Sequence, residues 1–241
     1  MGREARLGKV AGMSMGNEIE RRLEIVRARI ATAARHAGRN PSSIRLVLAS
    51  KTQPSAAIRA ASQAGARDFG ENYVQEAIAK RAELADLTEI RWHLIGHLQT
   101  NKARAAASAF ALIHSIDSVR LAEALGRAQP SPRVRALIEV NLGAEASKSG
   151  VAPDGVAALV DAVRDKIEIE GLMTIPPPAA GAATTRPYFA RLREMRDRLA
   201  VQSGLALSEL SMGMTDDFEI AIEEGATIVR VGRAVFGERT A

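Results

Sequence analysis

Apolar runs alternate with amphipathic segments along the chain from residue 44 onward. Runs without polar alternation are typical of strands buried on both faces, and the segments between them have helical spacing. We expect eight strands, at 45–51, 66–70, 91–96, 111–116, 135–142, 168–175, 207–212 and 228–232. Eight βα units in 241 residues favour an α/β fold with a single closed (β/α)8 barrel of the TIM type, which takes ~250 residues, over an open doubly wound sheet.

One further helix precedes the first strand. Ile19, Leu23, Val26 and Ile30 form an apolar stripe at spacings of four, three and four residues. Residues 1–16 contain four glycines and are expected to be a disordered extension. We therefore expect one barrel domain over residues 17–241, with an extra N-terminal helix.

Two later helix starts carry capping patterns. Asn72 with Gln75 predicts the N-cap of one helix, and Asp216 with Glu219 predicts another.

Composition narrows the functional class. Cysteine is absent, which excludes disulfides and thiolate chemistry. No apolar run is long enough to span a membrane and no signal-peptide pattern is present, so we expect a cytoplasmic protein without a membrane partner. The net charge of +5 is concentrated in residues 1–45, and aromatic residues make up only 3% of the chain, so nucleic acid is not an expected partner.

A lysine ends the first strand. Lys51 follows the apolar run of residues 46–49, at the carboxyl end of the strand, where barrels hold their active sites. A surface lysine that only extends its amine to water is the alternative interpretation.

The last two strands predict a phosphate site. Ser211 lies near the end of strand seven and can donate a hydroxyl, while Gly232 ends strand eight and lets the backbone approach an anion. Alternatively, Gly232 merely allows a tight strand-to-helix turn. A lysine amine facing a phosphate cradle is what pyridoxal phosphate requires.

Arg230 has the same strand parity as Gly232 and is expected to point inward. An arginine beside a pyridine nitrogen would disfavour protonation of that nitrogen. The alternative is a buried ion pair with Glu71 or Glu139. We interpret His93 as a core or supporting residue, and the histidines show no metal-ligand spacing, so no metal is expected.

Several motifs in register resemble one family, the pyridoxal phosphate homeostasis proteins (YggS/PROSC). They are LVLASKT (46–52), FGENYVQE (69–76), WHLIGHLQTNKAR (92–104), KSG (148–150), GLMTIPP (171–177), LSMGMTDDFEIAIEEGATIVRVG (210–232) and AVFG (234–237). The resemblance implies a barrel like that of alanine racemase and pyridoxal 5′-phosphate held as an internal aldimine. It also implies a role in vitamin B6 homeostasis without an established reaction.

The resemblance also implies roles for individual residues. Lys51 would form the Schiff base, Asn72 would lie beside the cofactor, Ser211 and Gly232 would hold the phosphate, and Arg230 would address the pyridine nitrogen. Arg233 departs from the family, which commonly has a small hydroxyl residue there. Its guanidinium either replaces that phosphate contact or points to solvent.

We therefore expect no catalytic residues, and a monomer or weak dimer that stores or transfers the cofactor. The alternatives are a racemase-like enzyme or a Schiff-base aldolase that uses Lys51. Enzymes that lack their pyridoxal phosphate are candidate partners, and they would dock on the basic first helix through Arg21, Arg22, Arg27 and Arg29.

Overall fold

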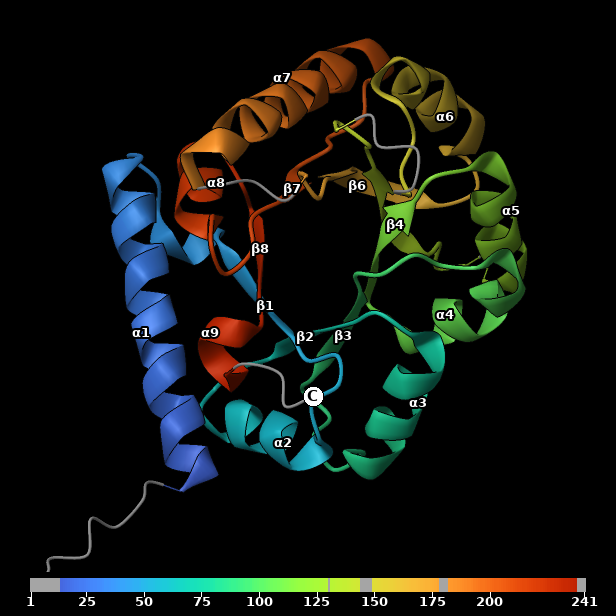
Figure 1. The fold of residues 1–241 in the computed structure, drawn as a ribbon. Coiled ribbons are helices and arrows are strands. Elements are labelled where there is room, and N and C mark those ends of the chain that lie inside the picture. Colours follow the sequence, from blue (N-terminus) through green and yellow to red (C-terminus); the bar gives the residue numbers. More distant parts are fainter. Residues whose placement is uncertain (1–13, 130, 144–148, 178–181, 238–241) are drawn as a thin grey trace, which may run out of the picture.

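Eight parallel strands pair in sequence order, and the eighth pairs with the first, which closes the sheet into a barrel (Figure 1). The strands are β1 Arg45–Ala49, β2 Asp68–Glu71, β3 Arg91–Leu94, β4 Leu112–Ile116, β5 Arg135–Glu139, β6 Glu168–Met173, β7 Glu209–Ser211 and β8 Ile228–Val231. The computed structural model describes residues 14–129, 131–143, 149–177 and 182–237. The predicted α/β barrel is confirmed.

Helices surround the barrel. They are α1 Met15–His36, α2 Ser55–Gln63, α3 Val74–Glu83, α4 Ala103–Ala109, α5 Val119–Ala128, α6 Val156–Val163, α7 Arg186–Ser203, α8 Phe218–Glu223 and α9 Arg233–Phe236. Short 3-10 turns lie at Pro41–Ser43, Thr100–Lys102, Pro153–Gly155 and Ala182–Thr185. All eight predicted strands are present, but most end earlier than predicted because the chain turns into its loops within the apolar run.

The N-terminal helix α1 packs against α2, α8 and α9 on the outside of the barrel (Figure 1). Its predicted stripe is buried, and Leu23 is fully buried. The hydroxyl of Ser14 accepts the backbone N–H of Asn17 and caps the helix, so Met15 and Gly16 are helical although the sequence placed them in the extension. Residues 1–13 lie outside the described part.

Both predicted N-cap pairs are wrong in position. Tyr73, not Asn72, occupies the N-cap of α3. Asp217, not Asp216, occupies the N-cap of α8, and its carboxylate accepts the backbone N–H of Met214 at 2.7 Å. In each case the chain turns one residue later than the capping pattern indicates, which leaves Asn72 and Asp216 on the loops.

The hydrophobic core has two parts. The larger part lies between the helices and the outer face of the barrel. The smaller part lies inside the barrel and comprises Val47, Leu112, Leu137, Met173 and Ile228. Polar side chains share that interior, among them His93, His114, Ser211 and Arg230.

Within the described residues, no helix combines the length and the apolar character that a membrane span needs.

Candidate functional site

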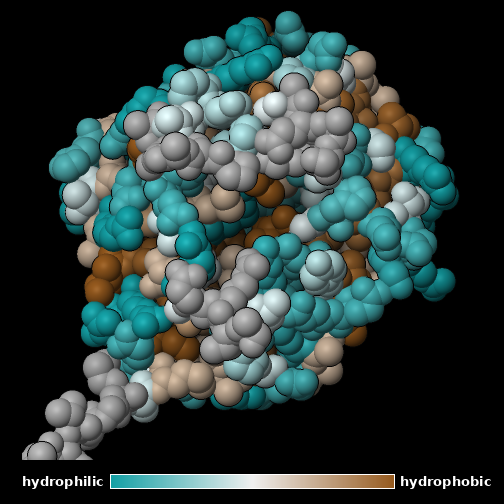
Figure 2. Space-filling model, in the orientation of Figure 1, coloured by the Kyte–Doolittle hydropathy of each residue, from teal (hydrophilic) through white to brown (hydrophobic). Residues whose placement is uncertain are grey.

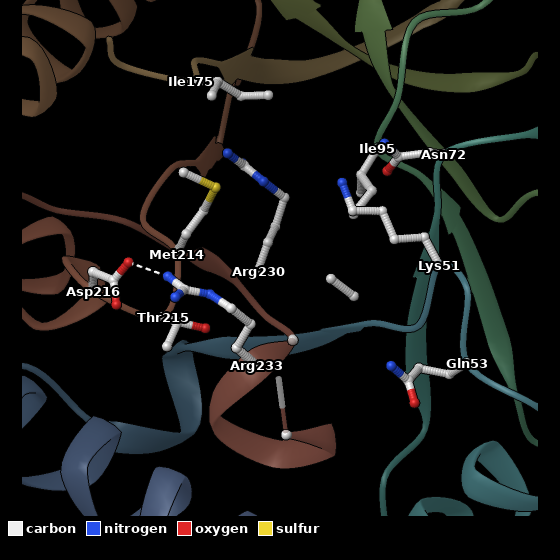
Figure 3. A pocket seen from close by; sticks show the side chains of 13 residues that line it. Lys51, Gln53, Asn72, Ile95, Ile175, Met214, Thr215, Asp216, Arg230 and Arg233 are labelled. Atoms are coloured by element: carbon white, nitrogen blue, oxygen red, sulfur yellow. Dashed lines mark hydrogen bonds and ion pairs between the residues drawn. The ribbon is translucent and has the colours of Figure 1, made fainter. Parts of the chain in front are cut away.

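A cavity of about 200 Å³ lies at the carboxyl ends of the strands. Lys51 lies on one side of it, and Arg230, Met214 and Thr215 lie on the other (Figure 3). Figure 2 shows the face drawn in Figure 1, where hydrophobic residues lie at the centre and hydrophilic residues surround them. The remaining lining residues are Ala49, Gln53, Asn72, Ile95, Ile175, Asp216, Gly232, Arg233 and Gly237.

Lys51 follows β1 in a turn whose backbone is constrained on both sides. Thr52 has a φ of 65°, a left-handed conformation that is uncommon for a residue other than glycine. Its backbone N–H donates to Oε1 of Glu76 at 2.7 Å. On the other side, the hydroxyl of Ser50 donates to Oε1 of Glu71 at 2.7 Å. These bonds fix the direction in which Lys51 leaves the strand.

A second lysine connects these groups. The amine of Lys80, on α3, donates to Oε1 of Glu71 at 2.9 Å, to Oε1 of Glu76 at 2.7 Å and to the backbone oxygen of Ser50 at 2.8 Å. Burial raises the pKa of Glu71, although Ser50 and Lys80 oppose that shift. Partial burial also acts to raise the pKa of Glu76. The hydrogen bonds from Lys80 and from the backbone of Thr52 outweigh that effect, so the pKa of Glu76 is lowered. We call Glu71, Glu76 and Lys80 the lysine clamp.

Arg230 reaches the cavity from β8. Its Nη1 donates to the Ser211 hydroxyl at 2.6 Å, and its Nη2 donates to the backbone oxygen of Thr174 at 3.0 Å. Burial lowers the pKa of Arg230 to about 10, against the opposing effect of Glu139 and Asp217. The predicted inward orientation is present. The alternative ion pair with Glu71 or Glu139 is not observed among the described residues, where no carboxylate lies within 4.0 Å of this guanidinium.

Ser211 lies below the cavity instead of lining it. Its side chain is fully buried, and its hydroxyl also lies 2.8 Å from Nδ1 of His114. A direct contact between Ser211 and a phosphate therefore stays a prediction. Thr215, four residues later, lines the cavity. The segment 212–216 after strand seven was expected at this face of the barrel, but no individual role was predicted for Thr215.

Gly232 and Arg233 form the turn from β8 into α9. A Cβ at Gly232 would lie 3.0 Å from the backbone oxygen of Ala49, so this glycine allows β8 to run close to the end of β1. Arg233 lines the cavity and forms an ion pair with Asp216 (Figure 3). Its side chain is 47% exposed, and a contact between its guanidinium and a phosphate stays a prediction.

Asn72 lines the cavity at the end of β2. A Cβ at Gly96 would lie 2.6 Å from the backbone oxygen of Asn72, so Gly96 leaves room for that turn. The apolar lining residues Ile175 and Met214 lie in the segments 174–175 and 212–216, which follow strands six and seven and were expected at this face of the barrel. Ile95 was not predicted, because nothing in its local pattern separates it from a core residue. Lys148 of the KSG motif lies outside the described residues.

The basic residues of α1 have partners within the chain. Arg21 and Arg22 both bond the carboxylate of Glu18. Arg27 donates to the backbone oxygen of Ala64 at 2.9 Å, and Arg29 pairs with Glu219 at 2.6 Å. This surface is therefore less strongly basic than the sequence alone indicates.

Comparisons with known proteins address the family directly. The family model "Alanine racemase, N-terminal domain" matches residues 22–240. A pyridoxal phosphate homeostasis protein of Pseudomonas aeruginosa is 49% identical over 218 residues, which covers 89% of this chain and 93% of the relative. The protein of the same name from Escherichia coli K12 is 39% identical and covers 92% of this chain and 97% of the relative.

Solved structures agree with the sequence comparisons. PipY of Synechococcus elongatus, solved with pyridoxal phosphate bound, is 42% identical with a TM-score of 0.81, covering 91% of this chain and 100% of that one. An alanine racemase of Clostridium difficile, 12% identical with a TM-score of 0.69 over 93% of this chain and 58% of its own, shares the fold alone. The barrel, the cavity and these matches establish that the chain belongs to the pyridoxal phosphate homeostasis protein family.

Proposed function

We propose that the cavity binds pyridoxal phosphate reversibly at Lys51, and that the protein stores or delivers this cofactor. The observation that carries the proposal is the meeting of Lys51, Arg230 and the Gly232 turn around one cavity of about 200 Å³. The related PipY structure, solved with pyridoxal phosphate bound, supports the choice of ligand.

The residues present fit this ligand. When bound, pyridoxal phosphate supplies an aldehyde that condenses with a primary amine and releases one water. Lys51 is the amine on the cavity wall, while the Gly232 turn, Thr215 and Arg233 supply donors and positive charge suited to a phosphate. Ile95, Ile175 and Met214 supply apolar contacts for a ring.

Arg230 is suited to the ring nitrogen. A buried cation beside a pyridine nitrogen disfavours its protonation, because two like charges in a poorly solvated site repel each other. An unprotonated ring withdraws electrons weakly, so this arrangement favours holding the cofactor over using it for carbanion chemistry.

The racemase and aldolase alternatives have less support. Racemisation requires a second acid or base facing the lysine. The described residues that line the cavity include neither a tyrosine nor a histidine, and the carboxylate among them, that of Asp216, is paired with Arg233. Tyr73 is 63% exposed and Tyr188 lies on the outer helix α7. Amino-acid turnover by the purified protein that disappears in Lys51→Ala would revive these alternatives.

Borohydride trapping tests the proposal. The protein is loaded with pyridoxal phosphate, reduced and digested, and the modified peptide is identified by mass spectrometry. We expect the pyridoxyl group on Lys51, with loss of the visible absorption band in Lys51→Ala. Lys166→Ala, which removes an exposed lysine from the loop before β6, should retain both signals. A label on another residue, or no label, contradicts the proposal.

Delivery requires its own measurement. The loaded protein is mixed with an enzyme that lacks its pyridoxal phosphate, and recovery of enzyme activity is followed over time. Transfer faster than release into buffer supports direct docking on the recipient. Loss of this difference on neutralising Arg21, Arg22, Arg27 and Arg29 assigns the docking surface to α1, whereas equal rates support storage alone.

A further inference from the structure

A line of buried polar side chains crosses the barrel interior from its amino end to Arg230. Oδ1 of Asp68, at the start of β2, lies 2.9 Å from Nε2 of His93 on β3. Nδ1 of His93 lies 3.0 Å from Nε2 of His114 on β4. Nδ1 of His114 lies 2.8 Å from the hydroxyl of Ser211, which accepts Nη1 of Arg230 at 2.6 Å. We call Asp68, His93, His114 and Ser211 the interior chain.

These side chains occupy space that apolar residues would fill at lower cost. His114 and Ser211 are fully buried, and Asp68 and His93 are exposed by only 6% and 2%. Burying polar groups costs free energy unless each has a partner. Every ring nitrogen and hydroxyl of the interior chain has a hydrogen-bond partner. Losing one member of the interior chain should therefore weaken the bonds of the others.

The contacts allow one consistent placement of protons. Asp68 also accepts two bonds from Arg91, at 2.8 and 2.6 Å, so its carboxylate is ionised and accepts a proton donor from His93. His93 then carries its proton on Nε2, and its bare Nδ1 accepts from Nε2 of His114. The bare Nδ1 of His114 accepts the Ser211 hydroxyl, whose lone pair faces Arg230. All donors therefore point from Arg230 toward Asp68.

We propose that the interior chain is a positioning device that holds the guanidinium of Arg230 in the cavity floor, with its polarity set by Asp68 at the opposite end of the barrel. The effect of Arg230 on a pyridine nitrogen rests on the proposed function, but the interior chain and the direction of its hydrogen bonds do not. Asp68, His93 and His114 thereby become functional residues, although none of them lines the cavity.

The electrostatic surroundings agree with two neutral histidines. The charged groups that act on the rings are Asp68, Arg45 on β1 and Arg91 on β3 for His93, and Arg45 and Arg230 for His114. Burial lowers the pKa of both rings, and for His93 the bond to Asp68 opposes that shift. At Asp68 burial acts to raise the pKa, but Arg91 and His93 outweigh it and keep the pKa low. Protonating His93 on Nδ1 would place two hydrogens between Nδ1 of His93 and Nε2 of His114. Protonating His114 on Nδ1 would replace the acceptor of the Ser211 hydroxyl with a second donor.

Nitrogen NMR of the cofactor-free protein with ¹⁵N-labelled histidine tests the polarity directly. We expect His93 and His114 to carry a proton on Nε2 and none on Nδ1, unchanged from pH 5.5 to 8.5. A proton on Nδ1 of either ring, or titration of either ring in that range, overturns the proposal. This measurement needs no ligand, so its outcome is independent of whether pyridoxal phosphate binds.

A matched pair of substitutions tests the link to Arg230. His114→Asn places an amide near the position of Nδ1 and preserves an acceptor for Ser211, whereas His114→Gln places it near Nε2 and does not. The readout is the rotation rate about the Nε–Cζ bond of Arg230 in the cofactor-free protein. We expect rotation about two- to tenfold faster in His114→Gln, the change expected from losing the bond between the neutral Ser211 hydroxyl and the neutral ring, and little change in His114→Asn. Equal rates in the wild type and His114→Gln contradict the link.

A remote substitution tests the role of Asp68, and a matched control is available. Asp68→Asn should give a mixture of tautomers at His93 and faster rotation of Arg230. Glu170→Gln removes the same charge from the same end of the barrel, where Glu170 on β6 pairs only with Arg135 on β5 among the described residues. It should change neither signal. The proposal is wrong if both variants behave alike.

Discussion

The two turns that face each other across the cavity are held by different means. The turn that carries Lys51 depends on side chains, because the lysine clamp bonds the backbone or side chains of its neighbours Ser50 and Thr52. The turn at Gly232 depends on close backbone packing against Ala49. The Lys51 side of the cavity is therefore vulnerable to single substitutions outside its lining, whereas the Gly232 side tolerates changes of side chain and resists added volume.

Substituting Lys80 should have the largest effect. Lys80→Met leaves Glu71 buried without its cation, and losing one partner of a buried pair costs about 3–5 kcal/mol. Denaturant unfolding measures the loss, and Lys166→Met is the exposed control. A double variant that adds Glu71→Gln should recover part of the stability. A cost below about 1 kcal/mol would show that the clamp does not hold the turn.

Adding a methyl group to the other turn should cost less. Gly232→Ala places a Cβ 3.0 Å from the backbone oxygen of Ala49, and added volume at a packed site costs about 1–3 kcal/mol. Pyridoxal phosphate binding should weaken as well, since β8 must shift away from β1. Gly16→Ala, whose nearest neighbour would be 3.8 Å away, should leave thermal unfolding unchanged or raise the melting temperature. Equal behaviour of the two variants would argue against the close approach.

The pH dependence of stability should have opposite signs at two carboxylates. The pKa of Glu71 is raised above its ordinary value of 4.5, so its contribution is largest at low pH and decreases as the pH rises above that value. The pKa of Asp68 is lowered from 3.8, so its contribution is present above that value and is lost as the pH falls below it.

Unfolding free energies of Glu71→Gln and Asp68→Asn between pH 2.5 and 8 check these signs. Relative to the wild type, Glu71→Gln should gain stability as the pH rises, and Asp68→Asn should lose least stability at the acid end. Parallel curves for the two variants would contradict the assignment of opposite shifts.

Arg233→Ser should have the smallest effect. Arg233 is 47% exposed, and an exposed ion pair such as its pair with Asp216 contributes about 0–1 kcal/mol. The serine supplies the small hydroxyl that the resemblance in the sequence led us to expect, and a substitution at this exposed position should leave stability within about 0.5 kcal/mol of the wild type. The change in the dissociation rate of pyridoxal phosphate then reports whether the guanidinium faces the phosphate, with Asp216→Asn as the control that breaks the same ion pair.

The barrel was predictable from the sequence because most strands lie in apolar runs that alternate with helical segments. The inward parity of Arg230 followed from the same pattern. The ends of the elements were not predictable, because the chain turns one residue after the capping patterns at Asn72 and Asp216 indicate. Such turns depend on tertiary contacts, such as the space that Gly96 leaves beside Asn72.

The supporting groups of the site were the least predictable part. Asp68, His93 and His114 lie on three successive strands, and their contact depends on how far each strand is displaced along the next. Lys80 looks like any helix-surface lysine in the sequence, yet its side chain is 9% exposed and bonds two carboxylates. Ser211 was correctly placed at the end of its strand. Whether its hydroxyl faces the cavity or His114 depends on packing inside the barrel, which the sequence pattern does not reveal.

Closure of the barrel through β1 and β8 brings the first and last strands of the fold into register, with Leu48 opposite Val231. A molecule held by Lys51 and by the Gly232 turn would therefore span the pairing of β1 with β8 that closes the barrel. Binding of pyridoxal phosphate should slow any separation of β1 from β8, because separating these strands would also require releasing the bound molecule. During synthesis on the ribosome, the contacts from Lys51 and from the Gly232 turn can act together only after β8 has emerged.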